Sequence, residues 1–178
     1  ASGVVATCAG GLATYTLPAA TTADLAPSDG WSVVWTVTLP GETVARTVRS
    51  DVVLAVVRLY APCAETDLYQ RCPSLDSTRK GTIAPTFTEY TGFLDDAWGQ
   101  LYQRMIEEQK APWLMSSSAP LREAHLTLSL AMIHEAFSTK MNAAYLEQAR
   151  DYRRQFNDAY SRARVPMKPA TATAASAP

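Results

Sequence analysis

The chain has 178 residues, of which 47% are hydrophobic and 19% charged, and its formal net charge is -1. This composition supports one domain or two small ones with a buried core, and it excludes a disordered protein. A nearly neutral chain is not a general polyanion binder, so any contact with DNA must come from a local patch. No apolar run approaches the roughly 18 residues that indicate a membrane-spanning helix.

The beginning of the chain, Ala1-Ser2-Gly3, lacks the basic and apolar regions of a signal peptide, which favours synthesis in the cytoplasm. The 3 cysteines, Cys8, Cys63 and Cys72, are odd in number and predict reduced thiols rather than a disulfide framework. A bridge between Cys63 and Cys72 stays open, because sequence alone does not give the distance between them.

Alternating residues early in the chain predict β-strands. Ala13–Leu17 alternates over a short stretch, and a turn is expected at Ser28-Asp29-Gly30. Trp31–Leu39 then alternates, with apolar residues at every second position and Val34 on the other face, which is typical of a half-buried strand. On this pattern Trp31 and Trp35 are expected to be core residues rather than a binding platform.

Two more strands are expected before residue 62. Pro40-Gly41 predicts a tight turn, so that Thr43–Arg49 pairs back as the second arm of a hairpin. Val52–Tyr60 is rich in apolar and β-branched residues and predicts a central strand buried on both faces. The expected result is a β domain over residues 1–61, a small antiparallel sheet or open sandwich of four or five strands.

The next part of the chain changes from β to helical character. Residues 62–86 are expected to form a connecting segment with one short helix at Glu65–Arg71. The pattern Thr86-Phe87-Thr88-Glu89 predicts a capping box that starts a long helix ending near Lys110. Ala111-Pro112 follows and would stop that helix.

Two further long helices are expected. Ser117 or Ser118 caps a helix over Leu121–Phe137 that is apolar almost all round, which places it at the centre of its layer. Asn142 caps a last helix that runs to about Arg164. The helical domain therefore spans residues 87–164, and the chain is predicted to be α+β, a small N-terminal sheet followed by three or four helices and an extended C-terminal tail.

No constellation of residues in the sequence predicts an enzyme. His125 and His134 lie nine positions apart on the most apolar helix, so they point to different sides and are expected to be hydrogen-bonded core or interface residues. Asp95-Asp96 is explained by the dipole of the helix that begins just before it, and Gly10-Gly11 by a turn. The sequence predicts no catalytic residue, no cofactor and no metal ligand.

One charged segment is a candidate binding surface. Between Glu147 and Lys168 there are six basic and three acidic residues, an excess of three positive charges. A solvated helix face is one interpretation, and a surface near DNA or an acidic protein is the other. Arg150, Arg153 and Arg154 are the candidates for a basic face that meets a channel or a partner.

The end of the chain, Val165–Pro178, consists mainly of Pro, Ala, Thr and Ser. A segment of this composition cannot bury enough apolar surface to fold alone. We therefore expect a tail that is disordered when free and ordered when it is docked on a partner.

The helical part of the chain resembles the head-to-tail connector (adaptor) proteins of tailed bacteriophages. Residues 119–133, with a capped start, a charged pair, a His and an aliphatic run, resemble the central helix of that family. Residues 145–160, with Tyr152-Arg153-Arg154-Gln155-Phe156, resemble its last helix, and residues 88–106 its first long helix. Val56–Pro62 and Asp67-Leu68 resemble the entry to these helices, so the resemblance covers roughly Val52 to Arg164, and the N-terminal sheet departs from the smallest, all-helical members.

The resemblance implies a virion protein of the neck, made in the cytoplasm of a bacterial host and assembled as a homo-oligomeric ring, usually of twelve copies. The ring would bind the portal protein on one side and a stopper or tail-terminator protein on the other, and genomic DNA would pass through its channel without sequence specificity and without any membrane contact. In similar proteins the chain end reaches onto the portal, which implies the following portal-binding residues here: Arg162, Arg164, Val165, Pro166, Met167, Lys168 and Pro169.

Two other functions stay open on the sequence. The first is a virion decoration or receptor-binding β module with a helical oligomerisation region, in which the exposed face of the sheet binds the partner. The second is a small DNA-binding protein that uses the Arg-rich last helix, which would bind DNA as a free chain with steep salt dependence.

Overall fold

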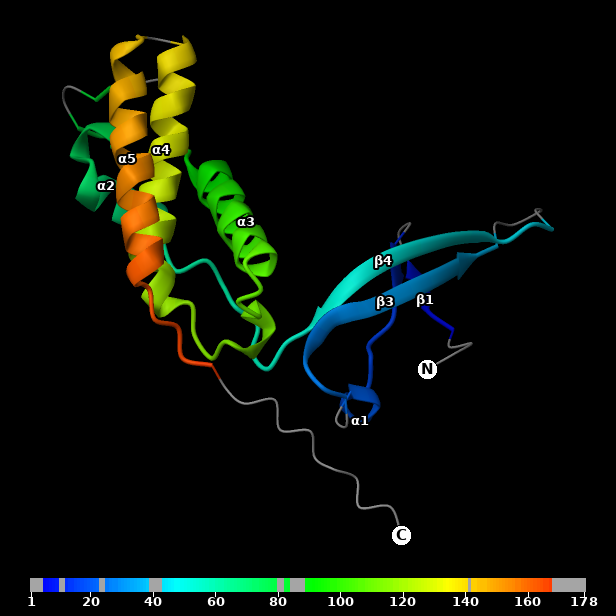
Figure 1. Ribbon diagram of the computed structural model, residues 1–178. Coiled ribbons are helices and arrows are strands. Elements are labelled where there is room, and N and C mark those ends of the chain that lie inside the picture. The colour runs from blue at the N-terminus through cyan, green and yellow to red at the C-terminus, as the bar shows by residue number, and fades with distance from the viewer. Residues whose placement is uncertain are drawn as a thin grey trace. The chain divides into compact units, whose positions relative to one another are not determined.

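The computed structural model describes residues 5–9, 12–22, 25–38, 43–79, 82–83, 89–140 and 142–167 (Figure 1). Antiparallel strands come first and helices follow, so the chain has the α+β fold that was predicted. The described residues form two units, a β unit that ends at Leu54 and a helical unit that begins at Ala55. The division therefore falls earlier than residue 61.

The β unit contains two separate two-stranded sheets in its described part, where one sheet of four or five strands was expected. β1 (Thr7–Ala9) pairs antiparallel with β2 (Leu12–Thr14), and a short helix, α1 (Ala19–Thr22), follows. β3 (Ser28–Val37) pairs antiparallel with β4 (Arg46–Leu54). The expected turns at Gly10-Gly11 and Pro40-Gly41 lie outside the described residues.

The predicted strand ends were wrong at two places early in the chain. Tyr15, Thr16 and Leu17 follow β2 and are not in a strand, because the β1–β2 pairing ends at Thr14. The expected turn at Ser28-Asp29-Gly30 is instead the first part of β3. The pairing with β4 is irregular between Ser28 and Trp31, and such irregularities let a strand continue through residues that would otherwise end it.

The predicted division into strands at Thr43–Arg49 and Val52–Tyr60 was also wrong. One strand, β4, runs through Arg46–Leu54 without interruption, and Ala55–Tyr60 is not in a strand. The charged residues Arg49 and Asp51 do not break β4, because their side chains share the solvent face of the ribbon. Val56 N–H donates to the backbone oxygen of Trp113 (2.9 Å), which ties this segment to the helical unit.

The β3–β4 ribbon has one apolar face and one polar face. Trp31 is paired with Val52, and Trp35 with Val48, and paired residues in an antiparallel sheet point to the same side. We name this side the apolar ribbon face; its apolar residues are Trp31, Val33, Trp35, Val37, Val48 and Val52, and Ser50 and Arg46 lie on the same side. The expectation that both tryptophans are core residues was wrong, since each is half-buried, and the four valines are exposed.

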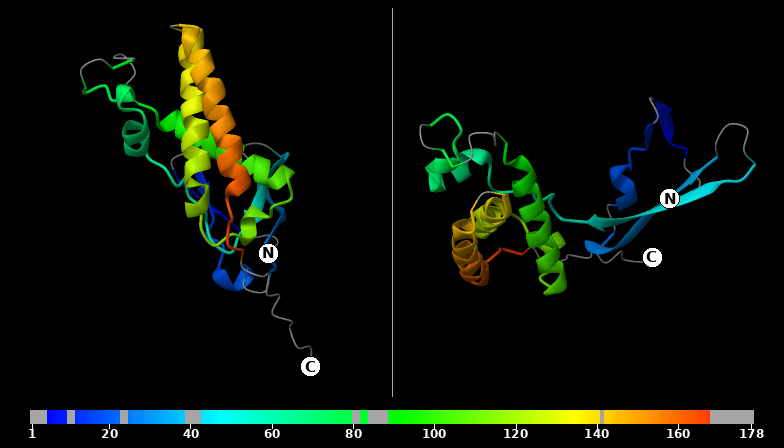
Figure 2. Two further views of the ribbon diagram at one scale, coloured as in Figure 1. Left: turned by 60° about the vertical axis from the view of Figure 1, so that its left-hand side comes forward. Right: turned by 90° about the horizontal axis from the view of Figure 1, so that it is seen from above.

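The helical unit contains four α-helices in its described residues, with three short 3₁₀ turns between them (Figure 2). The helices are α2 (Glu65–Arg71), α3 (Thr91–Glu107), α4 (Arg122–Lys140) and α5 (Ala144–Arg162). α4 and α5 lie side by side in all views, and α3 packs on α4. The short helix α2 has the bounds that were predicted.

α4 is the central helix, as its all-round apolar sequence predicted. Every residue from Ala124 to Ala131 is buried. Its Leu128 packs with Leu101 and Phe156, while its Leu130 and Phe137 pack with residues that include Leu68 and Tyr90. The helix therefore contributes to both hydrophobic clusters of the unit.

The first long helix does not begin at the expected capping box. Residues 84–88 lie outside the described residues, but α3 starts at Thr91, so Glu89 precedes the helix instead of capping it from inside. The carboxylate of Glu65 on α2 takes this role, accepting from the backbone N–H of Tyr90 and from Thr91 Oγ1 (3.1 Å). A carboxylate at this end also interacts favourably with the helix dipole.

The other helix ends follow the sequence more closely. α3 ends at Glu107, and the left-handed backbone at Gln109 and Ala111 (φ 56° and 43°) turns the chain before Pro112. Ala143, and not Asn142, is the N-cap residue of α5, but Asn142 lies directly before it and its Oδ1 accepts from the backbone N–H of Ala144 (2.9 Å).

Candidate functional site

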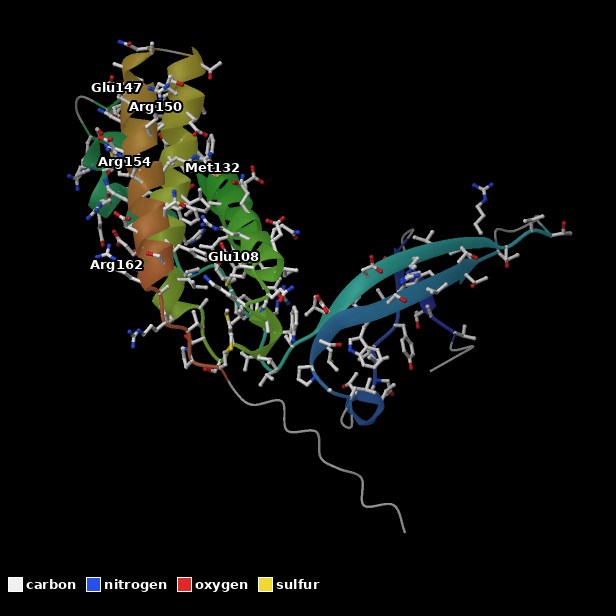
Figure 3. The ribbon with its side chains drawn as sticks, viewed as in Figure 1. Glu108, Met132, Glu147, Arg150, Arg154 and Arg162 are labelled. Atoms are coloured by element: carbon white, nitrogen blue, oxygen red, sulfur yellow. The ribbon has the colours of Figure 1, made fainter. Side chains whose placement is uncertain are left out.

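The outer face of α5 carries the candidate basic residues (Figure 3). Arg150, Arg154 and Arg162 are exposed and follow one another along the helix. Arg154 pairs with Asp151, and Arg162 Nε donates to the backbone oxygen of Asp158 (3.1 Å). Among the described residues, no carboxylate forms an ion pair with Arg150. This face is therefore basic but partly neutralised by its own acidic residues.

Arg153 faces α4 and forms an ion pair within the chain. Its Nε and Nη2 donate to the two carboxylate oxygens of Glu135 on α4, at 3.0 and 2.8 Å. This two-bond geometry fixes the guanidinium beside α4. Arg153 thus joins α4 to α5, and the expected set of Arg150, Arg153 and Arg154 does not form one free basic patch.

The first residues of the C-terminal tail are docked on their own chain. The backbone oxygen of Pro166 accepts from both the N–H and the Oγ of Ser116, each at 3.2 Å. Met167 forms a β-bridge with Met115, and half-buried Val165 packs against the hydrophobic cluster that contains Met115. Val165–Met167 is therefore part of the fold, which the low-complexity composition did not predict.

The expected portal-binding residues thus fall into three groups, of which the half-buried Val165 is one. Arg162, Arg164, Pro166 and Met167 are exposed at the end of α5 and just after it. Lys168 and Pro169 lie outside the described residues. The structure therefore places the described members of the set at one end of the helical unit.

A second charged cluster joins the end of α3 to α5. Glu108 accepts from Arg104, Lys110 and the Tyr160 hydroxyl, at 2.8, 2.8 and 3.0 Å. The hydrogen bonds from Lys110 and Arg104 lower the pKa of Glu108 to about 2. Both cations also lie over the Tyr160 ring, at 4.0 Å for Lys110 and 4.5 Å for Arg104. Sequence spacing shows the i,i+4 pair of Arg104 and Glu108 and the neighbouring Lys110, but it does not show Tyr160, which is 52 residues from Glu108.

A cavity of about 380 Å³ lies beside His134. It is lined by side chains of the α2 end, α4 and α5, including Arg71, Gln148, Tyr152 and Gln155. The His134 ring stacks on Tyr152 with centroids 5.2 Å apart. Neither ring nitrogen has a hydrogen-bond partner among the described residues, contrary to expectation, and burial lowers the pKa of His134. His134 is therefore a neutral core side chain at the wall of the cavity.

His125 is buried and hydrogen-bonded, as expected. Its Nε2 lies 2.8 Å from the backbone oxygen of Leu94 on α3, and its ring meets Trp98 edge-on with centroids 5.7 Å apart. Burial lowers the pKa of His125, while the bond to Leu94 acts in the opposite direction. The two histidines face different neighbours and do not form a site together.

The three cysteines are free, so Cys63 and Cys72 are not bridged. Burial raises the pKa of Cys63 to about 11, and its thiol donates to the backbone oxygen of Arg122 (3.2 Å). A protonated, enclosed thiol of this kind is a poor nucleophile. Over the residues that the structure describes, no group of three or more potential metal ligands is present. Within the same residues, no helix is long and apolar enough to cross a membrane.

No family model matches the chain, and no curated protein or solved structure matches it either.

Proposed function

We propose that this chain is a head-to-tail connector subunit of a tailed bacteriophage, a non-enzymatic protein that assembles as a ring beneath the portal. The observation that supports this proposal is the layout of the helical unit. α4 is buried between α3 and α5, and α5 carries aromatic residues inside and arginines outside. This is the layout that the resemblance to connector proteins implies.

The positions of the basic residues fit the proposal. Three excess charges are too few for tight DNA binding by one chain, but a ring repeats them around its circumference. Arg150, Arg154 and Arg162 are exposed along one helix, so each copy would offer the same row of cations. Such a row would attract passing DNA or an acidic partner without sequence specificity.

The docked start of the tail also fits the proposal. Because Val165–Met167 is bound to Ser116 and Met115, the chain beyond Met167 starts from a defined point of the helical unit. A tail tethered in this way reaches a partner with a higher effective concentration than a free segment. In the proposed assembly, Lys168–Pro178 makes the portal contact.

The decisive experiment measures particle mass for the chain alone and mixed with the portal protein encoded beside it. A ring-sized complex on the portal is expected. A chain that ends at Met167 keeps the docked segment, so it should fold normally and bind the portal less tightly. The matched control is Arg58→Gln, which removes one exposed cation outside the proposed binding surfaces without shortening the chain. Absence of any complex with full-length chain would rule out the connector function.

A virion decoration or receptor-binding β module is the second candidate. The observation in its favour is the apolar ribbon face, whose four valines are exposed. Substituting Val48 and Val52 by Thr would then abolish attachment to virions, whereas shortening the chain to Met167 would have no effect. A free DNA-binding protein is less well supported, because Arg153 and Arg154 already form ion pairs.

A further inference from the structure

The β3–β4 ribbon leaves one edge of β4 unpaired within the described part of the β unit. β3 is the one strand that pairs with β4 there, and all side chains from Arg46 to Val53 are exposed. Unpaired edges are usually blocked by Pro, by charged side chains, especially Lys, or by a bulge. β4 has neither Pro nor Lys, its pairing with β3 is regular from Arg46 to Val52, and its central charged residues Arg49 and Asp51 are of opposite sign. Its edge is therefore able to pair with another strand.

The order of residues in β4 is complementary to itself. Arg49 and Asp51 lie on either side of Ser50, and Val48 and Val52 lie one position further out. When two copies of β4 run antiparallel with Ser50 opposite Ser50, Arg49 faces the partner's Asp51 and Val48 faces the partner's Val52. Directly opposite residues point to the same side, so each charged pair lies on the polar face and each valine pair continues the apolar ribbon face.

The neighbouring registers are unfavourable. Moving the centre of pairing to Arg49 places Arg49 opposite the partner's Arg49, and moving it to Asp51 places two aspartates opposite each other. Like charges directly opposite destabilise a strand pair. In a register shifted by one residue, the centre of pairing lies between two residues. The apolar ribbon face of one copy would then continue into the polar face of the other. The register centred on Ser50 is therefore specified by charge as well as by hydrophobic pattern.

The exposure of the charged pair supports a contact between copies. The side chains of Arg49 and Asp51 are 69% and 80% exposed, and within one chain their Nε and Oδ1 are 3.4 Å apart. Both side chains are thus available on the solvent face. A two-stranded ribbon is marginally stable by itself in water, whereas a four-stranded sheet lies in the common size range.

We propose that two copies of this chain associate through β4, forming a four-stranded sheet about a two-fold axis at Ser50. This inference does not rest on the proposed connector function. Ring closure uses head-to-tail contacts between different surfaces, while the β4 contact uses the same surface of both copies. The two proposals therefore predict different particle masses, a dimer through β4 and a larger ring through other contacts.

The test is sedimentation of the full chain over a concentration series, with two charge-reversal variants. Wild type should show a reversible dimer. Arg49→Asp and Asp51→Arg each convert both cross-strand charged pairs into like-charged pairs, so the dimer dissociation constant of each should rise about tenfold or more. Circular dichroism of each variant checks that the exposed substitution leaves the fold unchanged.

Dimer formation in a mixture of the two variants tests the proposed charge pairing most directly. In an equimolar mixture, a strand with two acidic residues meets a strand with two basic residues, so a heterodimer should form about as tightly as wild type. The pair within each chain is broken in both variants, so recovery in the mixture cannot come from it. A monomeric wild type, unaffected variants, or a mixture no tighter than its components would each overturn the proposal.

Discussion

The strand β4 of the β unit and the central helix α4 of the helical unit differ in burial over most of their length. Every residue of β4 from Arg46 to Val53 is exposed, whereas every residue of α4 from Ala124 to Ala131 is buried. Both segments are rich in apolar residues. The difference arises because α4 is packed by two long helices, while β4 has one neighbouring strand in the described residues. Apolar content alone therefore does not determine burial.

The polar residues of the two segments also differ in what satisfies their hydrogen bonds and charges. Thr127 and Ser129 are buried in α4, and their hydroxyls donate to the backbone oxygens of Glu123 and His125, each at 2.8 Å. A helix can thus satisfy small polar side chains internally. Arg49 and Asp51 in β4 need solvent or another charge, so the strand remains suited to contacts with water or a partner.

The largest expected difference comes from one charge placed in α4 and one placed in the β3–β4 ribbon. Leu128→Asp puts an unpaired carboxylate among buried residues, and we expect a loss of more than about 4 kcal/mol, enough to unfold the helical unit. Val34→Asp changes a residue that is 57% exposed and should cost about 1 kcal/mol or less. Urea unfolding followed by circular dichroism measures both. Similar losses for the two variants would contradict the contrast in burial.

The next largest effect concerns the docked start of the tail. A chain that ends at Ala163 loses the Ser116–Pro166 hydrogen bonds and the packing of Val165, so its unfolding free energy should fall by about 1–3 kcal/mol. A chain that ends at Met167 keeps all of these contacts and should be as stable as full length. Equal stability of the two truncated chains would show that the docking contributes nothing.

Sequence patterns predicted the helices better than the strands, for physical reasons. The apolar stripe of α3 and the all-round apolar character of α4 come from periodicity within each helix, so local sequence is sufficient. The N-terminal cap of α3 comes from Glu65, which is distant in the chain, and no local motif reveals it. The predicted division of β4 was wrong, because the apolar run that begins at Val52 indicated a separate central strand, whereas one pairing with β3 continues from Arg46 to Leu54.

The candidate site also depends on contacts that local sequence patterns do not predict. Composition and helical spacing predicted Arg150, Arg153 and Arg154 as the basic residues of α5, whereas the exposed arginines along the helix are Arg150, Arg154 and Arg162. The arginines of α5 that are available to a partner depend on α4. Glu135 on α4 binds Arg153, whereas Arg150 is exposed and has no such contact. Tertiary contacts of this kind, like those of Val165–Met167 with Ser116, leave no periodic signal in the sequence.

Acid should destabilise the helical unit through its buried histidines. Burial lowers the pKa of His125 and His134 in the folded chain, so the unfolded chain, with a usual histidine pKa near 6.5, binds more protons. Stability is then complete above about pH 6.5 and falls as the pH drops towards the folded values, by at most about 1.4 kcal/mol per histidine per pH unit. Urea unfolding between neutral and mildly acid pH measures this slope.

Replacing His134 separates the contributions of the two histidines. His134→Phe keeps a ring against Tyr152 and removes two nitrogens without partners, so it should reduce the acid slope and leave stability at neutral pH unchanged or slightly higher. His125→Phe loses the bond to Leu94 and should cost about 1–2 kcal/mol at neutral pH. An unchanged acid slope in both variants would assign the pH response to other groups.

The smallest expected effect is the coupling between Arg153 and Glu135. The two side chains are 41% and 42% exposed, so solvent screens the ion pair, and a double-mutant cycle with Ala should give about 0.5 kcal/mol. The same cycle with Arg150 in place of Arg153 should give no coupling, because Arg150 does not contact Glu135. If Arg150 and Arg153 behaved alike, Arg153 would be a free surface cation, and all three arginines would be available to a partner. A measured difference would restrict the basic face of α5 to Arg150, Arg154 and Arg162.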